Sequence, residues 1–300
     1  MPATSTTSPR NCAPIARRPP LLDLRQRLTA RIGGTVAEAH EPATLQELVA
    51  LVDRLRARGR AFRVLAGGSN IVASDRPREE AIVSLRSLRH WQARTETLWH
   101  AEAGVPLGEM VARSARRGLT GLECCHGVPG SLGAAVRINA GGKWGTIAAV
   151  LREVTLLTPG GEVVRREITP ADFAYRRTAF WDDLVLAATL EFTRSDPATT
   201  RARIDQVHQH KRTTQPLAFP SAGCIFRNPS PAAPAGRLID AAGLKGTRIG
   251  GALVSPLHAN YIVNAGGATG ADFLALMALV RERVREVHGL TLDHEVEVWE

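Results

Sequence analysis

The 300-residue chain is poor in aromatic residues and lacks any long apolar run. Phe, Trp and Tyr together make up 5% of it, and no stretch of about 18 apolar residues occurs, so no segment is predicted to span a membrane. The formal net charge is +9, yet the basic residues are scattered among acids and form no block interleaved with aromatics. This distribution argues against nucleic-acid binding and fits attraction of anionic small substrates.

Cysteine is also scarce, and its spacing excludes the common cysteine-based sites. The four cysteines are Cys12, Cys124, Cys125 and Cys224, and no C-x-x-C pair occurs. We therefore predict no metal site and no disulfide framework, and a reducing, cytoplasmic location. A G-x-G-x-x-G motif between a strand and a helix is missing too, which argues against a Rossmann dinucleotide fold.

The first 20 residues contain no acids and no apolar core segment, so they do not resemble a secretory signal. Their Ser, Thr, Pro and Arg bias predicts a disordered N-terminal tail over 1–20, with an organelle transit peptide as the alternative.

The remaining pattern mixes helices and strands without a regular alternation, which predicts an α+β fold. Helices are expected over 41–59, with Thr44 and Glu47 as a capping box, over 106–118, over 198–216 and over 269–289. In the last of these, Phe273, Met277, Val280, Val284 and Val287 are expected to form one buried stripe. We expect a cofactor-binding region over 21–200, in two subdomains divided near 80, and a smaller domain over 201–300 whose final strand, around 291–300, packs back on the first region.

Two glycine-rich segments are the strongest candidates for a ligand site. The segment "AGGSN" places Gly67, Gly68, Ser69 and Asn70 between two apolar runs that are expected to be strands. The segment 121–146 is predicted to be a long loop in which glycines alternate with small residues, as in "HGVPGSLGAA". Such backbone lets a pyrophosphate or a flat flavin ring lie directly on free N–H groups.

Several motifs in fixed order resemble the UDP-N-acetylenolpyruvoylglucosamine reductase family. They are "LAGGSN", "GLECCHGVPGSLGAAVRINAGG", "YRRT", "QPLAFPSAGCIFRNP", "AGRLIDAAGLKGTRIGGALVSPLHANYIVN" and "HEVEVW", and they span about residues 20–300. The resemblance implies an FAD-binding region of the vanillyl-alcohol-oxidase type followed by a substrate domain. The short distance between "YRRT" and "FPSAGC" resembles the form of the family without an inserted substrate-covering loop.

The resemblance also implies roles for individual residues. It assigns catalysis to Arg176, Cys224 and Glu295, and substrate contacts to Tyr175, Arg212 and Asn228. It assigns FAD contacts to the two glycine loops, at Gly67, Gly68, Ser69, Asn70, Gly127, Val128, Pro129, Gly130, Ser131, Gly133 and Ala134. The chain departs from the family pattern at Ala66 (often glycine), Thr178 (serine) and Cys224 (often serine).

The implied reaction reduces an enol ether with NADPH and FAD, and it asks three things of the protein. Negative charge on the substrate needs a permanent cation, for which adjacent Arg176 and Arg177 compete on spacing alone; on an extended strand they would point to opposite faces. A carboxylic acid such as Glu295, in a low-dielectric pocket, would add a hydrogen bond. A protonated group must deliver a proton to the α-carbon, and a thiol with an ordinary pKa near 8.5 suits this at neutral pH.

Two other classes of protein remain open at this point. Another FAD-dependent oxidase or dehydrogenase, acting on a small alcohol or lactone, would explain the glycine loops but not the cysteine loop with Arg176 and Glu295. A basic nucleotide- or RNA-binding protein would explain the charge but not the loops. The resemblance favours an enzyme, a monomer, that binds UDP-N-acetylglucosamine-enolpyruvate and NADPH and needs neither nucleic acid nor a membrane.

Overall fold

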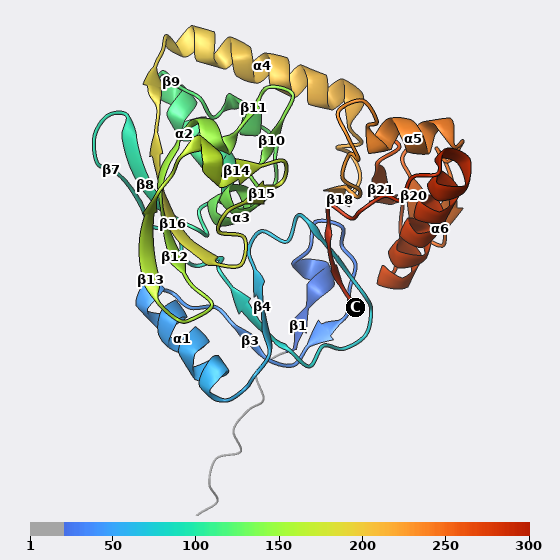
Figure 1. The fold of residues 1–300 in the computed structure, drawn as a ribbon, viewed down its shortest axis with the longest axis horizontal. Helices are drawn as coiled ribbons and strands as arrows, with labels where there is room; N and C mark the ends of the chain where they lie inside the picture. The colour runs from blue at the N-terminus through green and yellow to red at the C-terminus, as the bar shows by residue number, and fades with distance from the viewer. Residues whose placement is uncertain (1–20) are drawn as a thin grey trace, which may run out of the picture.

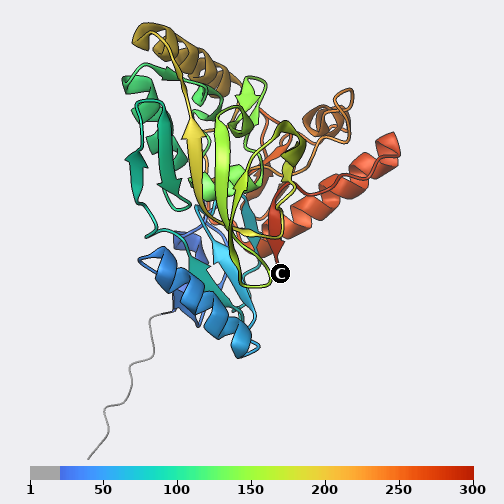
Figure 2. The ribbon, with the colours of Figure 1, turned by 60° about the vertical axis from the view of Figure 1, so that its left-hand side comes forward.

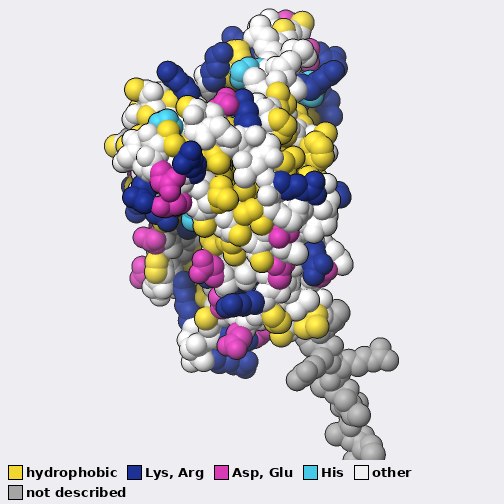
Figure 3. Space-filling model, turned by 90° about the vertical axis from the view of Figure 1, so that its right-hand side faces the viewer, with side chains coloured by type: hydrophobic (Ala, Val, Ile, Leu, Met, Phe, Trp, Pro, Cys, Tyr) yellow, Lys and Arg dark blue, Asp and Glu magenta, His cyan; other side chains and the backbone are white. Residues whose placement is uncertain are grey.

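The computed structural model describes residues 21–300, so the predicted N-terminal tail lies outside the described residues. Helices and strands are mixed, as expected for an α+β chain, and the sheets lie between helices α1, α2 and α6 (Figure 1). Within 21–300 no helix is long and apolar enough to cross a membrane. Basic and acidic side chains are interspersed around an apolar centre on the face shown in Figure 3, so the positive charge forms no single block there.

The first layer is a parallel sheet covered by helix α1 (Leu45–Ala57). Its strands follow the order β3–β6–β4 and comprise Ala39–His40, Ala81–Ser84 and Phe62–Leu65. Thr44 caps the helix as predicted, since its hydroxyl accepts a hydrogen bond from the Glu47 amide at 3.1 Å. The Glu47 carboxylate accepts from the Ala43 amide rather than from Thr44, so the reciprocal half of the box is shifted by one residue.

The second layer is a five-stranded antiparallel sheet that carries the largest apolar cluster. Its strand order is β13–β12–β16–β8–β7, comprising Val163–Glu167, Leu151–Leu157, Leu184–Glu191, Leu98–Glu102 and Trp91–Ala93. Helices α2 (Leu107–Arg116) and α3 (Leu132–Arg137) pack against this cluster. Pro106 is the N-cap of α2, so the helix begins at Leu107, one position after the start of the predicted range.

The segment 121–146 is not the continuous loop that its glycine content predicted. It contains a 3-10 turn at Glu123–Cys125, helix α3, and the hairpin of β10 (Gly141–Gly142) and β11 (Gly145–Thr146). Leu132, Ala135 and Val136 are buried at helical spacing, and their contact with the second sheet outweighs the low helix propensity of the glycines around them.

Helix α4 (Pro197–Thr214) leads from this sheet to the C-terminal part of the chain, along the top of Figure 1. There, helices α5 (Ala235–Ala241) and α6 (Gly270–His288) pack on a four-stranded antiparallel sheet. Its order is β18–β21–β20–β19, comprising Ser221–Cys224, Tyr261–Asn264, Ala252–Val254 and Arg248–Ile249.

Four of the five residues predicted for the α6 stripe are buried, but Val287 is 45% exposed. Leu276 is fully buried instead. Figure 2 shows α6 projecting from the body of the molecule, and Val287 lies in its last turn.

The final strand, β22 (Glu297–Trp299), pairs in parallel with β5 (Ile71–Ala73) rather than with its neighbours in sequence. Trp299 is fully buried there, and the guanidinium groups of Arg63 and Arg78 each lie 5.6 Å from its ring centroid. This pairing brings the segment around residue 295 against the first glycine loop. The other two-residue strands form short pairs: β1 (Leu22–Asp23) with β2 (Thr35–Val36), β9 (Leu119–Thr120) with β17 (Thr193–Arg194), and β14 (Phe173–Ala174) with β15 (Arg177–Thr178).

Candidate active site

The two glycine-rich segments lie against each other. A Cβ on Gly67 would stand 2.4 Å from the Cα of Gly130, so neither segment tolerates a side chain at this crossing. Ser69 fastens the contact, because its hydroxyl donates a hydrogen bond to the Pro129 carbonyl at 3.0 Å. Gly68 and Gly130 have φ values of +65° and +117°, which favour glycine. The sequence thus produces a wall of bare backbone, as a ligand-binding loop requires.

Two cavities lie along this wall and share Ala66, Gly67 and Leu85. The larger has a volume of about 720 Å³, within the usual range for a cofactor site. Most of the predicted cofactor-binding residues line it: Gly67, Gly68, Ser69, Asn70, Val128, Pro129, Gly133 and Ala134. Gly130 and Ser131 line the smaller cavity, of about 230 Å³, whereas Gly127 lines neither and lies beside Lys211.

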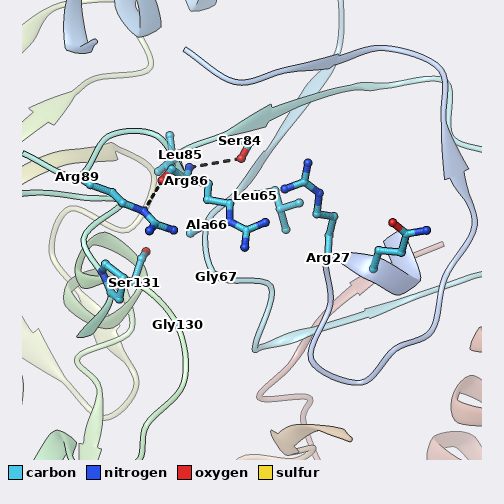
Figure 4. Close-up of a pocket in the computed structure, with 13 residues that line it drawn as sticks. Arg27, Leu65, Ala66, Gly67, Ser84, Leu85, Arg86, Arg89, Gly130 and Ser131 are labelled. Atoms are coloured by element: carbon cyan, nitrogen blue, oxygen red, sulfur yellow. Dashed lines mark hydrogen bonds between the residues drawn. The ribbon is translucent and has the colours of Figure 1, made fainter. Parts of the chain in front are cut away.

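The smaller cavity is basic, which the sequence motifs did not indicate. Arg27, Arg86 and Arg89 converge on it from segments that carry no recognisable motif (Figure 4). The Ser131 hydroxyl is buried beside them without a hydrogen-bond partner among the described residues. Of the three arginines, Arg27 also lies 3.8 Å from a carboxylate oxygen of Glu41. Cations and an unpartnered hydroxyl next to bare backbone suit phosphate groups, so the residues present fit an anionic dinucleotide.

Arg176 lies in a tight turn and not on the extended strand that the sequence suggested. Strands β14 and β15 pair Ala174 with Arg177, which leaves Tyr175 and Arg176 as the two turn residues. Arg176 has φ +55°, a left-handed conformation that costs a non-glycine residue about 1–3 kcal/mol. The turn directs its guanidinium to Glu295, and the Arg176 Nε–Glu295 Oε1 distance is 2.7 Å.

Glu295 is held by its backbone from two sides. Its amide donates to the Ile225 carbonyl at 2.8 Å, and its carbonyl accepts from the Asn70 side chain at 3.0 Å. Its side chain is only 14% exposed, although strand periodicity alone favours a solvated position for it. Glu295 therefore connects the first glycine loop, the cysteine loop and the Arg176 turn.

Cys224 ends strand β18 directly after Gly223, whose φ is +83°. It is the register partner of Tyr261 on β21, and the Tyr261 hydroxyl is within hydrogen-bonding reach of its sulfur. Burial, followed by the negative charge of Glu295, raises the pKa of the Cys224 thiol to about 12, against a weaker lowering by Arg176 and Tyr261. The ordinary thiol pKa assumed from the sequence is therefore wrong, and the group is protonated over a wider pH range than expected.

Two of the predicted substrate-binding residues, Tyr175 and Asn228, are exposed beside the Arg176 turn and the cysteine loop. The Asn228 amide donates to the Tyr175 hydroxyl at 3.4 Å, which joins the Arg176 turn to the cysteine loop. The Asn228 side chain accepts from the Ala235 amide at 2.9 Å. Arg212 is exposed in the last turn of α4. Of the other cations expected to attract anions, Lys211 donates to the His126 carbonyl and Lys245 pairs with Asp240 at 2.7 Å.

Comparison with known proteins decides the family. A model of the UDP-N-acetylenolpyruvoylglucosamine reductase C-terminal domain matches residues 215–299, and a model of an FAD-binding domain matches 37–167. The reductase of Desulfosudis oleivorans is 36% identical over 283 residues, covering 90% of either chain. That of a Synechococcus strain is 40% identical over 274 residues, covering 89% of either chain. The chain belongs to the UDP-N-acetylenolpyruvoylglucosamine reductase family.

The fold agrees with this assignment. The crystal structure of the reductase from Thermus caldophilus superposes with a TM-score of 0.76 at 32% identity, covering 94% of this chain and 98% of the other. The predicted α+β class, the FAD-dependent oxidoreductase class and the family resemblance are confirmed. Thr178 stands where the family pattern has serine. Its hydroxyl donates a hydrogen bond to the Arg137 carbonyl at 3.2 Å.

Proposed function

We propose that this chain reduces the enolpyruvyl group of UDP-N-acetylglucosamine-enolpyruvate to give UDP-N-acetylmuramate, a peptidoglycan precursor, with NADPH as the hydride source. The observation that carries the proposal is the Arg176–Glu295 ion pair beside the protonated thiol of Cys224, with Glu295 lining the cofactor-sized cavity. A cation, a carboxyl group and an uncharged acid match the charge changes of this reaction.

Gly67–Asn70 and residues 128–134 would hold FAD, with its phosphates near Ser131. Bound FAD would supply the hydride for the methylene carbon of the substrate. Arg176 binds the substrate carboxylate and stabilises the negative charge that spreads into it. Its ion pair with Glu295 fixes the guanidinium, and the strained turn shows that the surrounding structure maintains this position.

Cys224 delivers the proton that completes the reduction. Its S–H bond breaks as a C–H bond forms at the α-carbon, which leaves a thiolate that solvent must reprotonate. The positive charge of Arg176 lowers the pKa of Cys224, so Arg176 is the cation that would stabilise that thiolate. Tyr175, Arg212 and Asn228 would contact the sugar nucleotide at the outer edge of the site, where they are exposed.

The proposal includes a division of labour along the chain. Residues 21–200 hold FAD and residues 201–300 present the substrate site, with β22 returning Glu295 to the FAD region. We further propose that the protein is a cytoplasmic monomer with no nucleic-acid or membrane partner, because its substrates are water-soluble anions.

Separate measurement of the two half-reactions tests this function. In a stopped-flow experiment, NADPH should bleach the flavin absorbance of wild type and Cys224→Ala at similar rates. Reoxidation by the enolpyruvyl sugar nucleotide should slow by about 10²- to 10⁴-fold in Cys224→Ala, the usual worth of a general acid. Cys224→Ser is the matched control and should retain appreciable reoxidation.

Equal slowing of both half-reactions would show a structural role for Cys224. A flavin that small alcohols reduce and NADPH does not would replace the proposed function with that of an oxidase of the same FAD-domain type.

A further inference from the structure

One arginine that lines the larger cavity pairs with no carboxylate among the residues that the structure describes. Arg227 lines the larger cavity, and its Nε is buried without a hydrogen-bond partner among residues 21–300. The other arginines on the same walls are engaged: Arg63 pairs with Glu80 at 3.2 Å, and Arg137 donates to the Trp181 carbonyl at 3.0 Å. Arg56 also has an unpartnered nitrogen there, but it donates to the Thr158 carbonyl through Nη2 at 3.2 Å.

A guanidinium group cannot shed its charge to escape this position. Arginine stays protonated in proteins, and a buried charge without a partner is costly. The backbone of Arg227 is nevertheless fixed, because its amide donates to the Asp293 carbonyl at 2.8 Å, two residues before Glu295. The fold therefore keeps the Nε of Arg227 as a buried donor without a partner, and no described carboxylate pairs with its charge, which indicates that a bound anionic group completes it.

The position of Arg227 identifies which anionic group that is. The phosphates of a dinucleotide have their own basic cavity, lined by Arg27, Arg86 and Arg89 at the far side of the shared glycine wall. Arg227 is three residues from Cys224 and lies on the segment that pairs with Glu295, so it belongs to the reaction end. Hydride transfer requires the redox-active ring at that end, next to the substrate. The proposed function already assigns the substrate carboxylate to Arg176 and the sugar nucleotide to the outer residues of the site, so the charge left for Arg227 is the one that develops on the ring.

We propose that Arg227 stabilises the reduced isoalloxazine ring of FAD and thereby raises the midpoint potential of the bound flavin. Two electrons and one proton enter the ring on reduction by a hydride, which leaves one negative charge that a nearby cation stabilises relative to the oxidised ring. This inference rests on the proposed function only in that Arg176, Glu295 and Cys224 mark the reaction end of the cavity.

The test is the flavin midpoint potential of the FAD-loaded protein, measured without NADPH or sugar nucleotide. Arg227→Gln should lower the preference for reduced over oxidised FAD at least tenfold, which for two electrons is about 30 mV. The affinity for sulfite, which forms an anionic adduct with the oxidised ring, should fall about tenfold as well. Arg227→Lys, which keeps the charge, should recover most of both values, and circular dichroism should show both variants folded.

Arg63→Gln provides the matched control. Arg63 lines the same cavity, but Glu80 retains Arg78 as a partner at 2.8 Å, so the potential should move much less. An Arg227→Gln potential equal to that of wild type, or an equal shift in Arg63→Gln, overturns the inference. So does an unchanged potential combined with a raised KM for the sugar nucleotide, because Arg227 would then bind a substrate anion. A wrong substrate assignment would alter none of these potentials, so the two proposals fail separately.

Discussion

Substitutions of Arg176 can measure both the stability cost of its strained backbone and the contribution of its side chain to catalysis. We expect Arg176→Gly to be more stable than Arg176→Ala, although both lose the ion pair with Glu295. The two variants differ only in a Cβ at φ +55°. A left-handed conformation costs a non-glycine residue about 1–2 kcal/mol, and the greater freedom of glycine in the unfolded chain offsets about 0.4–1 kcal/mol of that.

The expected net difference is about 0.5–1 kcal/mol in favour of glycine, or about 1–3 °C in Tm for a chain of this size. Thermal unfolding of the FAD-loaded variants measures it. Both variants should also reoxidise their flavin with the sugar nucleotide about 10²- to 10³-fold more slowly than wild type, as expected when one donor to developing negative charge is removed. Their reduction by NADPH should change little.

Arg31 supplies the matched control, because it too has φ +55° but is exposed and lies outside the site. Arg31→Gly should exceed Arg31→Ala in Tm by a similar margin, with no effect on either half-reaction. Equal Tm values for Arg176→Gly and Arg176→Ala would refute the strain argument. Fast reoxidation in either Arg176 variant would refute the catalytic one.

Two further predictions follow from shifted pKa values. Because the pKa of Cys224 is raised to about 12, alkylation of this residue by iodoacetamide should accelerate about tenfold per pH unit from pH 7 to pH 10. A plateau near pH 8.5 in the rate that is lost in Cys224→Ser would contradict this. Burial alone would raise the pKa of Glu80, but hydrogen bonds from Arg78, its own backbone and Arg63 lower it to about 2. Its stabilising contribution is therefore full above about pH 5 and is lost as pH falls towards 2, so denaturant unfolding of Glu80→Gln should depend less on pH in this window than wild type or Glu79→Gln.

Local patterns predicted most of the secondary structure, because caps, turns and periodicity act over a few residues. Thr44, the hairpin glycines after Pro159 and the buried residues of α6 up to Val284 are examples. The failures arise where tertiary contacts outweigh local preference. Helix α3 forms among glycines because the second sheet buries Leu132 and Val136, and Val287 is exposed in the last turn of α6, where periodicity alone predicts burial.

The candidate site was predictable only in part for the same reason. Its glycines and its "YRRT" and "FPSAGC" motifs are continuous in sequence, so they could be recognised as units. Arg27, Arg86 and Arg89 are isolated arginines in a chain rich in arginine, whereas Arg227 lies within the motif "QPLAFPSAGCIFRNP". Only the fold shows that these arginines line a cavity. Nor does the sequence reveal that the pKa of Cys224 is raised. That shift comes from burial and from the charge of Glu295, which is distant from Cys224 along the chain.

The parallel pairing of β22 with β5 has a consequence for folding. The Asn70 side chain donates a hydrogen bond to the carbonyl of Glu295, 225 residues further along the chain. Contacts of such separation form late, because they require closure of almost the whole chain. A chain truncated before residue 295 would lack both Glu295 and the buried Trp299. The reaction end of the cavity is therefore expected to be completed late in folding, when the segment around residue 295 reaches the first glycine loop.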